Sequence, residues 1–412
     1  MTALPTHKDP TLTALDAVIE SANDSRPRPY LGASQIGQPC NRSLWFGFRW
    51  TMNRTIPAAG LRRIQDGFRG EKVLIDWLRK IPGIELWTEE DGGQQIGIED
   101  CAGHFRGHLD GVIQGLLQAP KTPHVWEAKV CNETKFNKLV KLIAQHGEKA
   151  ALKEWDETYY AQAQVYMRGT DLTRHYLTVA TPGCRDIVSC RTHYDKKAAE
   201  ALIKKAETII TADRPPLKIS ENPAWWQCKT CSYIGLCHYK EAPLINCRTC
   251  AHSTATLAGN AAWQCEHHHK PIDIAAQQAA CPNHAWHPDL LANYAEAIGA
   301  NPQTGSITFK RKDGSTVEIG MGATSSRQLL AESAPIAAPV VDEVLEELAT
   351  ESAIPAETLL SGQVDEEEWP KFTQAVTGFW DRWNHDQPRM ARLRNLIEVI
   401  DGAYCRLMER GA

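Results

Sequence analysis

The sequence of 412 residues is longer than a usual single domain, so two or three folded units are expected. Its 42% hydrophobic and 23% charged residues are typical of a soluble globular protein, and no apolar run approaches the ~18 residues of a membrane span. The N-terminus lacks a signal-peptide pattern, so the 13 cysteines predict metal ligation in a reducing, cytoplasmic compartment instead of disulfide bonds.

The net charge of −5 is unevenly distributed along the chain. Residues 331–412 carry 16 acidic and 7 basic side chains, which leaves 38 basic and 34 acidic side chains in residues 1–330. The larger part is therefore slightly positive, which permits nucleic-acid binding without indicating it.

The first 50 residues are expected to form a short arm and the start of a larger domain. Residues 12–22 have a helical pattern and lead into a connector rich in Pro and Arg. Cys40 follows, ahead of Arg42, Trp45 and Phe46. A single cysteine in such a place is most often a buried free thiol.

Residues 60–80 predict an amphipathic helix with Glu71 near its middle. A solvated position on the helix surface is one reading of Glu71. The apolar stripe of this helix consists of Val73, Leu74, Trp77 and Leu78.

Two segments on either side of a loop of turn residues predict a β-hairpin. Residues 105–113 and 124–130 alternate apolar and polar side chains, which places Asp110 beside Glu127, with Lys129 on the same face as Glu127. Two converging carboxylates form a hard-oxygen site suited to Mg²⁺ or Mn²⁺, and a nearby lysine can orient water or stabilise a phosphoryl group. A surface hairpin with solvated charges is the alternative.

The motif formed by Gly107-His-Leu-Asp110 and then Glu127-Ala-Lys129 resembles the PD-(D/E)xK nuclease superfamily. The resemblance is to its RecB-type exonuclease branch with an iron–sulfur cluster, which is similar to CRISPR-adaptation nucleases and AddB nuclease domains. It covers roughly residues 30–240 and implies an α/β fold of the restriction-endonuclease type, in which helices flank a mixed central sheet.

The resemblance also implies roles for particular residues. Asp110, Glu127 and the carbonyl of Ala128 would bind one or two Mg²⁺ or Mn²⁺ ions. Lys129 would position the nucleophile or stabilise the phosphate, and Glu71 is the best match to a further acidic residue supplied by the preceding helix.

Two helices are expected after the hairpin, over residues 132–154 and 155–167. Gln162 and Tyr166 are four residues apart and project from one face of the second helix. The superfamily carries a Gln-x-x-x-Tyr helix at this place, so both residues are candidate catalytic residues that align the substrate. A helix that packs aromatic residues into the core is the alternative. Residues 174–193 predict two more strands and residues 196–212 a helix.

Cys228, Cys231 and Cys237 form the strongest spacing signal outside the hairpin. Three thiolates leave a four-thiolate site one ligand short, and Cys40 is the natural fourth, as in the cluster-bearing relatives. The resemblance favours a [4Fe-4S] cluster over Zn²⁺, which four thiolates also bind.

A second set of cysteines follows at once: Cys247, Cys250, Cys265 and Cys281. Few strong core residues accompany them, so a small zinc-ribbon-like module that binds Zn²⁺ is expected. The histidines of this segment are possible substitute ligands or a surface cluster: His252, His267, His268, His269 and His284.

The remaining chain is expected to be appended to the nuclease-like domain. Residues 307–311 and 316–319 predict a β-hairpin, residues 331–370 an acidic linker with one short helix, and residues 371–412 a helical segment. The expected organisation is an N-terminal arm (1–30), a nuclease domain closed by a four-cysteine cluster (31–240), a cysteine-rich module (241–290), a β-hairpin extension (291–330), an acidic linker (331–370) and a C-terminal helical segment (371–412).

These expectations converge on a metal-dependent DNA exonuclease that acts on linear DNA or free ends. The resemblance places it in phage or mobile-element recombination, repair or replication, in the cytoplasm of a bacterial or phage-infected cell, with a recombination or replication protein as a possible partner. The alternatives are a catalytically silent DNA-binding or scaffold protein, a structure-specific endonuclease, and a cluster-based redox enzyme or cysteine-rich adaptor.

Overall fold

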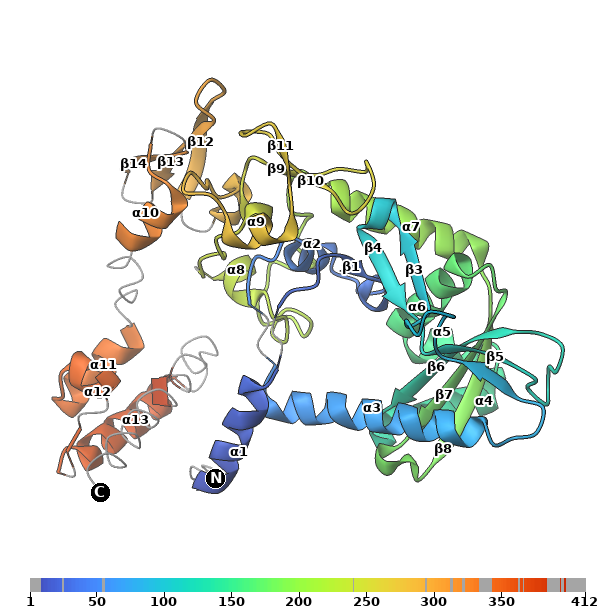
Figure 1. Ribbon diagram of the computed structural model, residues 1–412. Helices are drawn as coiled ribbons and strands as arrows, with labels where there is room; N and C mark the ends of the chain where they lie inside the picture. The colour runs from blue at the N-terminus through green and yellow to red at the C-terminus, as the bar shows by residue number, and fades with distance from the viewer. Residues whose placement is uncertain are drawn as a thin grey trace. The chain divides into compact units, whose positions relative to one another are not determined.

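A computed structural model describes the chain in two compact units, residues 1–326 and 327–412 (Figure 1). The described residues are 9–23, 26–53, 56–239, 241–292, 295–311, 314–320, 323–332, 343–361, 364–365, 367–383, 393 and 396–397. None of the helices in these ranges is both long enough and apolar enough to cross a membrane.

A five-stranded mixed sheet forms the centre of the first unit, with strand order β2-β5-β6-β7-β8. Its strands are β2 (Glu85–Trp87), β5 (Gly111–Gln114), β6 (His124–Val130), β7 (Arg174–Ala180) and β8 (Ile187–His193). Strands β6 and β7 are parallel and the other neighbours antiparallel, so the expected α/β class with a mixed central sheet is confirmed.

Strand β6 is buried on both faces because helices cover the sheet from both sides. Trp126 and Ala128 pack with Leu74 of α3 (Ala58–Leu78), which Figure 1 shows crossing one face. Val125 belongs to the core cluster on the other face, which includes residues of α6 (Glu157–Gly169) and α7 (Lys196–Thr211).

Helix α3 packs most of the expected stripe into the core, since Val73 and Leu78 lie half-buried against the cluster that contains Leu74. Leu74 is buried, but the side chain of Trp77 is 46% exposed. The close contact is made at Gly70, where a Cβ atom would lie 2.4 Å from Cγ2 of Val130. The backbone of α3 therefore approaches β6 at a position that the apolar pattern did not mark.

The first strand of the expected hairpin is two strands in different sheets, so the prediction of one continuous strand was wrong. β4 (Phe105–His108) lies between β1 (Leu31–Gly32) and β3 (Gly97–Asp100) in a separate three-stranded sheet. The chain changes sheets at Leu109 and Asp110, where the N–H of Leu109 donates to Ile96 O and the Asp110 carboxylate accepts from the N–H of Ala128. These contacts replace ladder hydrogen bonds at the change of sheet.

The connection from β6 to β7 contains three helices where two were expected. α4 (Glu133–His146) ends at Gly147, whose φ of +77° suits glycine, and α5 (Ala151–Trp155) follows. α6 begins after Asp156, whose side chain caps it by accepting from the N–H groups of Thr158 and Tyr159. The other helices of this part are α1 (Pro10–Ser21), η1 (Ala33–Gln35), α2 (Asn41–Phe48), η2 (Cys101–Gly103), η3 (Pro182–Cys184) and α8 (Ile234–His238).

The second cysteine-rich segment folds around a three-stranded antiparallel sheet, β11-β10-β9. Its elements are η4 (Cys247–Thr249), β9 (Ser253–Ala255), β10 (Trp263–Cys265), β11 (Lys270–Ile272), α9 (Ile274–Ala279) and η5 (Pro288–Leu290). The expectation of few core residues was wrong, because fully buried Trp263 joins the main core cluster together with Phe48 of α2.

The expected hairpin at residues 306–319 is present as β13 (Ser306–Arg311) and β14 (Thr316–Ile319). A further strand, β12 (Ala295–Asn301), pairs with β13 and was not predicted. Most of its residues are exposed, so it lacks the alternation that marks a half-buried strand.

The second unit has a hydrophobic core of its own. α11 (Glu343–Ser352), α12 (Ala356–Ser361) and α13 (Trp369–Trp383) bury Leu348, Leu359 and Phe379 against one another, after α10 (Ser326–Glu332) at the unit boundary. The short helix expected in the acidic linker is present as α11, and α12 is a second helix in that segment that was not expected. Most of residues 384–412, expected to be helical, lie outside the described residues.

Candidate functional site

The change of sheet after β4 brings Asp110 against β6. Oδ2 of Asp110 accepts a hydrogen bond of 2.8 Å from the backbone N–H of Ala128. Ala128 stands between Glu127 and Lys129 in β6, so all three expected residues of the hairpin lie together at one point of the central sheet.

Glu127 is the most constrained residue of this group. Its side chain is 5% exposed, and Oε1 accepts from Nζ of Lys129 and, at 2.9 Å, from Nε2 of Gln162. The other carboxylate oxygen, Oε2, is buried without a hydrogen-bond partner among the described residues. Burial and the nearby charge of Asp110 raise the pKa of Glu127 to about 8.

Lys129 supplies the positive charge of the site. Burial alone would lower the pKa of Lys129, but the carboxylates of Glu127 and Asp110 raise it above its usual range. The side chain is therefore an ammonium ion, and Nζ lies 5.3 Å from the centre of the Tyr159 ring.

Gln162 and Tyr166 lie one turn apart on α6, as their spacing predicted, and both belong to the hydrogen-bond network of Glu127. Nε2 of Gln162 also donates to the hydroxyl of Tyr166 at 3.1 Å, and that hydroxyl donates to His108 O at 2.8 Å. Tyr166 is 2% exposed, and burial and the charge of Glu127 raise its pKa. The chain of hydrogen bonds therefore links the Glu127 carboxylate to the end of β4.

Glu71 approaches the same carboxylates from α3. Burial and the charge of Asp110 raise the pKa of Glu71 to about 7, against the opposing effect of Lys129. Across the described ranges, no three His, Cys, Asp or Glu side chains are arranged to hold one metal ion. The candidate donors are the carboxylates of Asp110 and Glu127 and the carbonyl of Ala128, whose N–H donates to Asp110.

A divalent cation fits this donor set. Burial and the charge of half-buried Asp110 raise the pKa of Glu127, and Oε2 of Glu127 has no hydrogen-bond partner among the described residues. A cation would neutralise the repulsion and supply the missing partner, and carboxylate and carbonyl oxygens are the ligands that Mg²⁺ and Mn²⁺ prefer.

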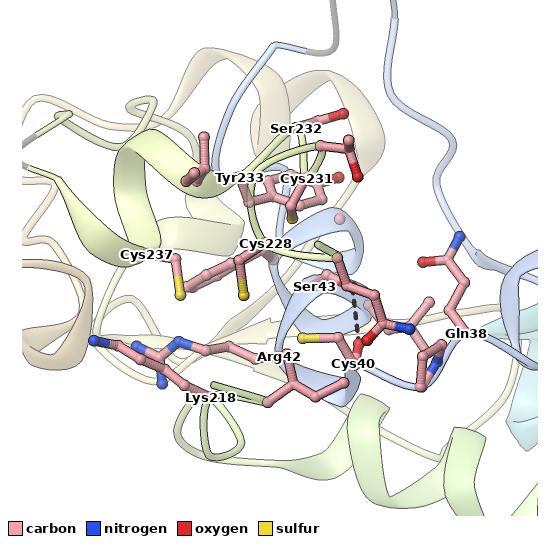
Figure 2. A pocket seen from close by; sticks show the side chains of 18 of the residues that line it. Gln38, Cys40, Arg42, Ser43, Lys218, Cys228, Cys231, Ser232, Tyr233 and Cys237 are labelled. Atoms are coloured by element: carbon pink, nitrogen blue, oxygen red, sulfur yellow. Dashed lines mark hydrogen bonds between the residues drawn. The ribbon is translucent and has the colours of Figure 1, made fainter. Parts of the chain in front are cut away.

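The first cysteine set also comes together, although Cys40 precedes the central sheet in sequence and its partners follow it. Cys40 lies at the start of α2, Cys237 lies in α8, and Cys228 and Cys231 lie in the turns before α8. Figure 2 shows these four residues around a cavity of about 300 Å³, which Arg42 and Lys218 also line.

Two cationic side chains in this cavity oppose the effect of burial on its thiols. Burial raises the pKa of the Cys237 thiol, and Arg42, which also hydrogen-bonds to this thiol, and Lys218 oppose that rise. Burial and the neighbouring Cys40 raise the pKa of Cys228, which Lys218 again opposes. Two cationic side chains therefore face thiols that must lose protons to ligate metal.

The thiols of the second cysteine set lie close enough to affect one another. Burial and the neighbouring thiols of Cys250, Cys281 and Cys265 raise the pKa of Cys247 to about 12. Among the histidines considered as substitutes, His284 is buried and its Nε2 contacts Asn246 O at 3.0 Å. The rings of His252, His267 and His268 contact one another instead.

Sequence reasoning missed the residues that surround the site on β4. His108 is exposed next to Leu109, Tyr30 contacts it, and Arg106 shares its face of the strand. The change of sheet hides this pattern in the sequence, because the residues belong to a different sheet from Glu127.

No protein-family model matches the sequence, and no curated protein matches it. Solved structures with a remote likeness include SSO0001, at 14% identity and a TM-score of 0.33 over 58% of this chain and 99% of that chain. The alkaline exonuclease LHK-Exo from Laribacter hongkongensis is another, at 13% identity and a TM-score of 0.30 over 47% of this chain and 90% of that chain. The LHK-Exo complex with dAMP has 12% identity and a TM-score of 0.30, covering 48% and 90% of the two chains.

Proposed function

We propose that the chain is a divalent-metal-dependent nuclease that hydrolyses phosphodiester bonds in DNA and acts as an exonuclease on linear DNA or free ends. The observation that carries the proposal is buried Glu127 next to half-buried Asp110 and the Lys129 ammonium, with Oε2 of Glu127 left without a hydrogen-bond partner among the described residues. Such a group is costly to bury unless a cation completes it.

The residues of the site divide the work between them. Asp110, Glu127 and the Ala128 carbonyl would hold the ion, and a bound Mg²⁺ or Mn²⁺ supplies Lewis acidity and a water of lowered pKa. Lys129 stays protonated next to this place, so it can donate to a phosphate oxygen or orient the attacking water. Gln162 fixes Glu127 through Oε1, which leaves Oε2 for the ion.

The two cysteine sets are proposed to hold structural metal groups. For Cys40, Cys228, Cys231 and Cys237 a [4Fe-4S] cluster is proposed over Zn²⁺, because the sequence resemblance favours it and all four cysteines line one cavity of about 300 Å³. For Cys247, Cys250, Cys265 and Cys281 the proposed group is Zn²⁺, because the thiols sit close enough to raise one another's pKa.

Iron and zinc analysis of protein purified without oxygen tests both assignments. The proposal expects a coloured protein with iron and zinc, loss of iron and colour in Cys231→Ser, and loss of zinc alone in Cys265→Ser. A colourless protein whose only metal is zinc would overturn the cluster assignment. The proposed setting, phage or mobile-element DNA metabolism in the cytoplasm with a recombination or replication partner, rests on the sequence resemblance.

Degradation of end-labelled linear DNA tests the central proposal. Cleavage is expected with Mg²⁺ or Mn²⁺ and is lost with EDTA. Covalently closed circular DNA resists an exonuclease, and its cleavage would favour the endonuclease alternative. Binding of DNA without cleavage under any of these ions would favour the catalytically silent alternative and overturn the proposal.

A further inference from the structure

The small sheet β1-β4-β3 has one face in the core and one open face. On the core side, Leu31 and Phe105 are buried, and a Cβ on Gly107 would lie 2.5 Å from the Tyr166 ring. Arg106 and His108 alternate with these residues along β4, so they project from the opposite, open face.

The neighbours of Arg106 and His108 leave this open face smooth. Gly32 pairs with Arg106 and Gly97 pairs with His108, so neither position adds a side chain. A Cβ on Gly32 would lie 3.3 Å from Nη1 of Arg28, so the guanidinium of exposed Arg28 lies over that glycine.

The open face combines cations with an aromatic ring. The Tyr30 ring lies 6.4 Å from the His108 ring, between centroids, at an interplanar angle of 60°. The described residues of the three strands place one carboxylate on this face, that of Glu99, which is 3.1 Å from Arg106. Both side chains of that ion pair are partly exposed, so the pair is weak and a phosphate group can replace Glu99.

The open face connects the candidate active site to a cavity. Arg106 stands four residues before Asp110, a separation of at most roughly 14 Å along the chain. In the other direction the face leads into a cavity of about 530 Å³ against the cysteine-rich segment, lined by Tyr30, Arg106, Asn260, Trp263, Asp273 and Gln277 among others. A cavity of this size is in the range that binds small ligands, which includes an unpaired nucleotide.

We propose that this open face binds the single-stranded continuation of the DNA whose phosphodiester bond lies at Asp110 and Glu127. Phosphates contact Arg28 and Arg106, and a base stacks on Tyr30. Cations that follow a backbone and an aromatic side chain that stacks with any base are the means by which proteins bind single strands without regard to sequence. This inference rests on the proposed nuclease function, which makes DNA the ligand, and on the open face, which supplies the residues that bind it.

The test is a binding measurement on the full-length chain with Asp110→Asn, which keeps the DNA intact. Fluorescence anisotropy with a labelled single-stranded oligonucleotide gives the Kd of this parent and of the same chain with Arg106→Gln or Tyr30→Ala. Each added substitution is expected to raise Kd about tenfold, as loss of one stacked base or one charge-assisted contact does. Arg62→Gln is the matched control. It removes an arginine of α3 from an exposed ion pair with Asp16 of α1 and should leave Kd within about twofold.

In the chain with an intact Asp110, Arg106→Gln should raise KM for a tailed DNA about tenfold at unchanged kcat, with unchanged hydrolysis of a small phosphodiester such as bis(p-nitrophenyl) phosphate. A parent that binds no single strand, or variants that bind as the parent does, would overturn the proposal, as would tighter binding of duplex DNA or of RNA of the same sequence. If only the nuclease proposal fails, the intact chain cleaves no DNA, but the two variants still bind the single strand more weakly than the parent does.

Discussion

Arg248 and Glu127 are both buried charged residues in residues 1–326, and they differ in how many of their polar atoms have a hydrogen-bond partner. Around Arg248, which is fully buried, Nε donates to Gln277 Oε1, Nη1 to Phe48 O and Nη2 to Pro29 O. Its guanidinium also lies 3.7 Å from the centre of the Trp50 ring. Around Glu127, by contrast, one carboxylate oxygen is buried with no hydrogen-bond partner among the described residues.

On the proposed function, this difference separates a structural charge from a functional one. A buried polar group whose donors are all satisfied stabilises one arrangement of the chain, here the contact of the cysteine-rich segment with α2 and the connector before β1. A buried group left incomplete is costly in the folded protein and persists where a ligand completes it. The two groups should therefore respond in opposite ways to substitution.

The largest expected effect is on catalysis. Asp110→Asn removes one of the two repelling carboxylates, so cleavage of linear DNA should fall on the order of 10³-fold while the melting temperature stays constant or rises. The measurements are kcat with Mg²⁺ and a thermal melt in EDTA. Asp16→Asn, at an exposed ion pair on α1, is the control and should change neither quantity. Full activity in Asp110→Asn would remove the assignment.

Arg248→Met should produce the reverse pattern. Three acceptors and the faces of the neighbouring aromatic rings lose their partner, so the free energy of unfolding should fall by about 3–5 kcal/mol. Denaturant unfolding measures this change. Arg62→Met, at an exposed ion pair, should cost less than about 1 kcal/mol. An equal loss in both variants would show that the buried arrangement contributes nothing special.

An intermediate effect is expected at Gln162, which contacts the incomplete group without belonging to it. Gln162→Leu leaves Oε1 of Glu127 with Lys129 alone, so the carboxylate is less well oriented. The affinity for Mn²⁺ should fall about 10–100-fold, as for other residues that orient metal ligands. Isothermal titration calorimetry measures it. Gln164→Leu is the control on the same helix, since Gln164 contacts the chain at His193 and Asp195 instead. It should leave Mn²⁺ affinity unchanged.

Local spacing predicted which residues of the site share a face of one strand or of one helix. A separation of two residues keeps Glu127 and Lys129 on one face of a strand, and a separation of four keeps Gln162 and Tyr166 on one face of a helix. These rules hold wherever the strand and the helix form, so the structure places all four residues as the pattern requires.

Tertiary contacts decided what the sequence did not predict. The change of sheet at Leu109 depends on hydrogen bonds to Ile96 and Ala128, which no local pattern encodes. Arg248 reads as a surface residue in a loop with cysteines, and its burial depends on aromatic rings about 200 residues earlier in the chain, at Phe48 and Trp50. A charged residue in a loop carries no local signal that its partners lie elsewhere in the fold.

The smallest expected effect is the dependence of stability on pH, which tests directly whether the Glu127 carboxylate lacks a partner in the folded protein. Burial and Asp110 raise the pKa of Glu127 to about 8 and that of Glu71 to about 7, whereas glutamate in an unfolded chain titrates near ~4.3. Between these values the folded protein binds more protons than the unfolded one, so the free energy of unfolding falls as the pH rises. In EDTA the melting temperature should therefore be lower at about pH 8.5 than at about pH 6, and Glu127→Gln should weaken this dependence.

Mn²⁺ binds the deprotonated carboxylates, so the rise in melting temperature that it causes should be larger at the higher pH. Two results would contradict a cation site at these carboxylates. One is a melting temperature in EDTA that rises over this pH range in the parent, and the other is a rise in melting temperature with Mn²⁺ that Glu127→Gln leaves unchanged.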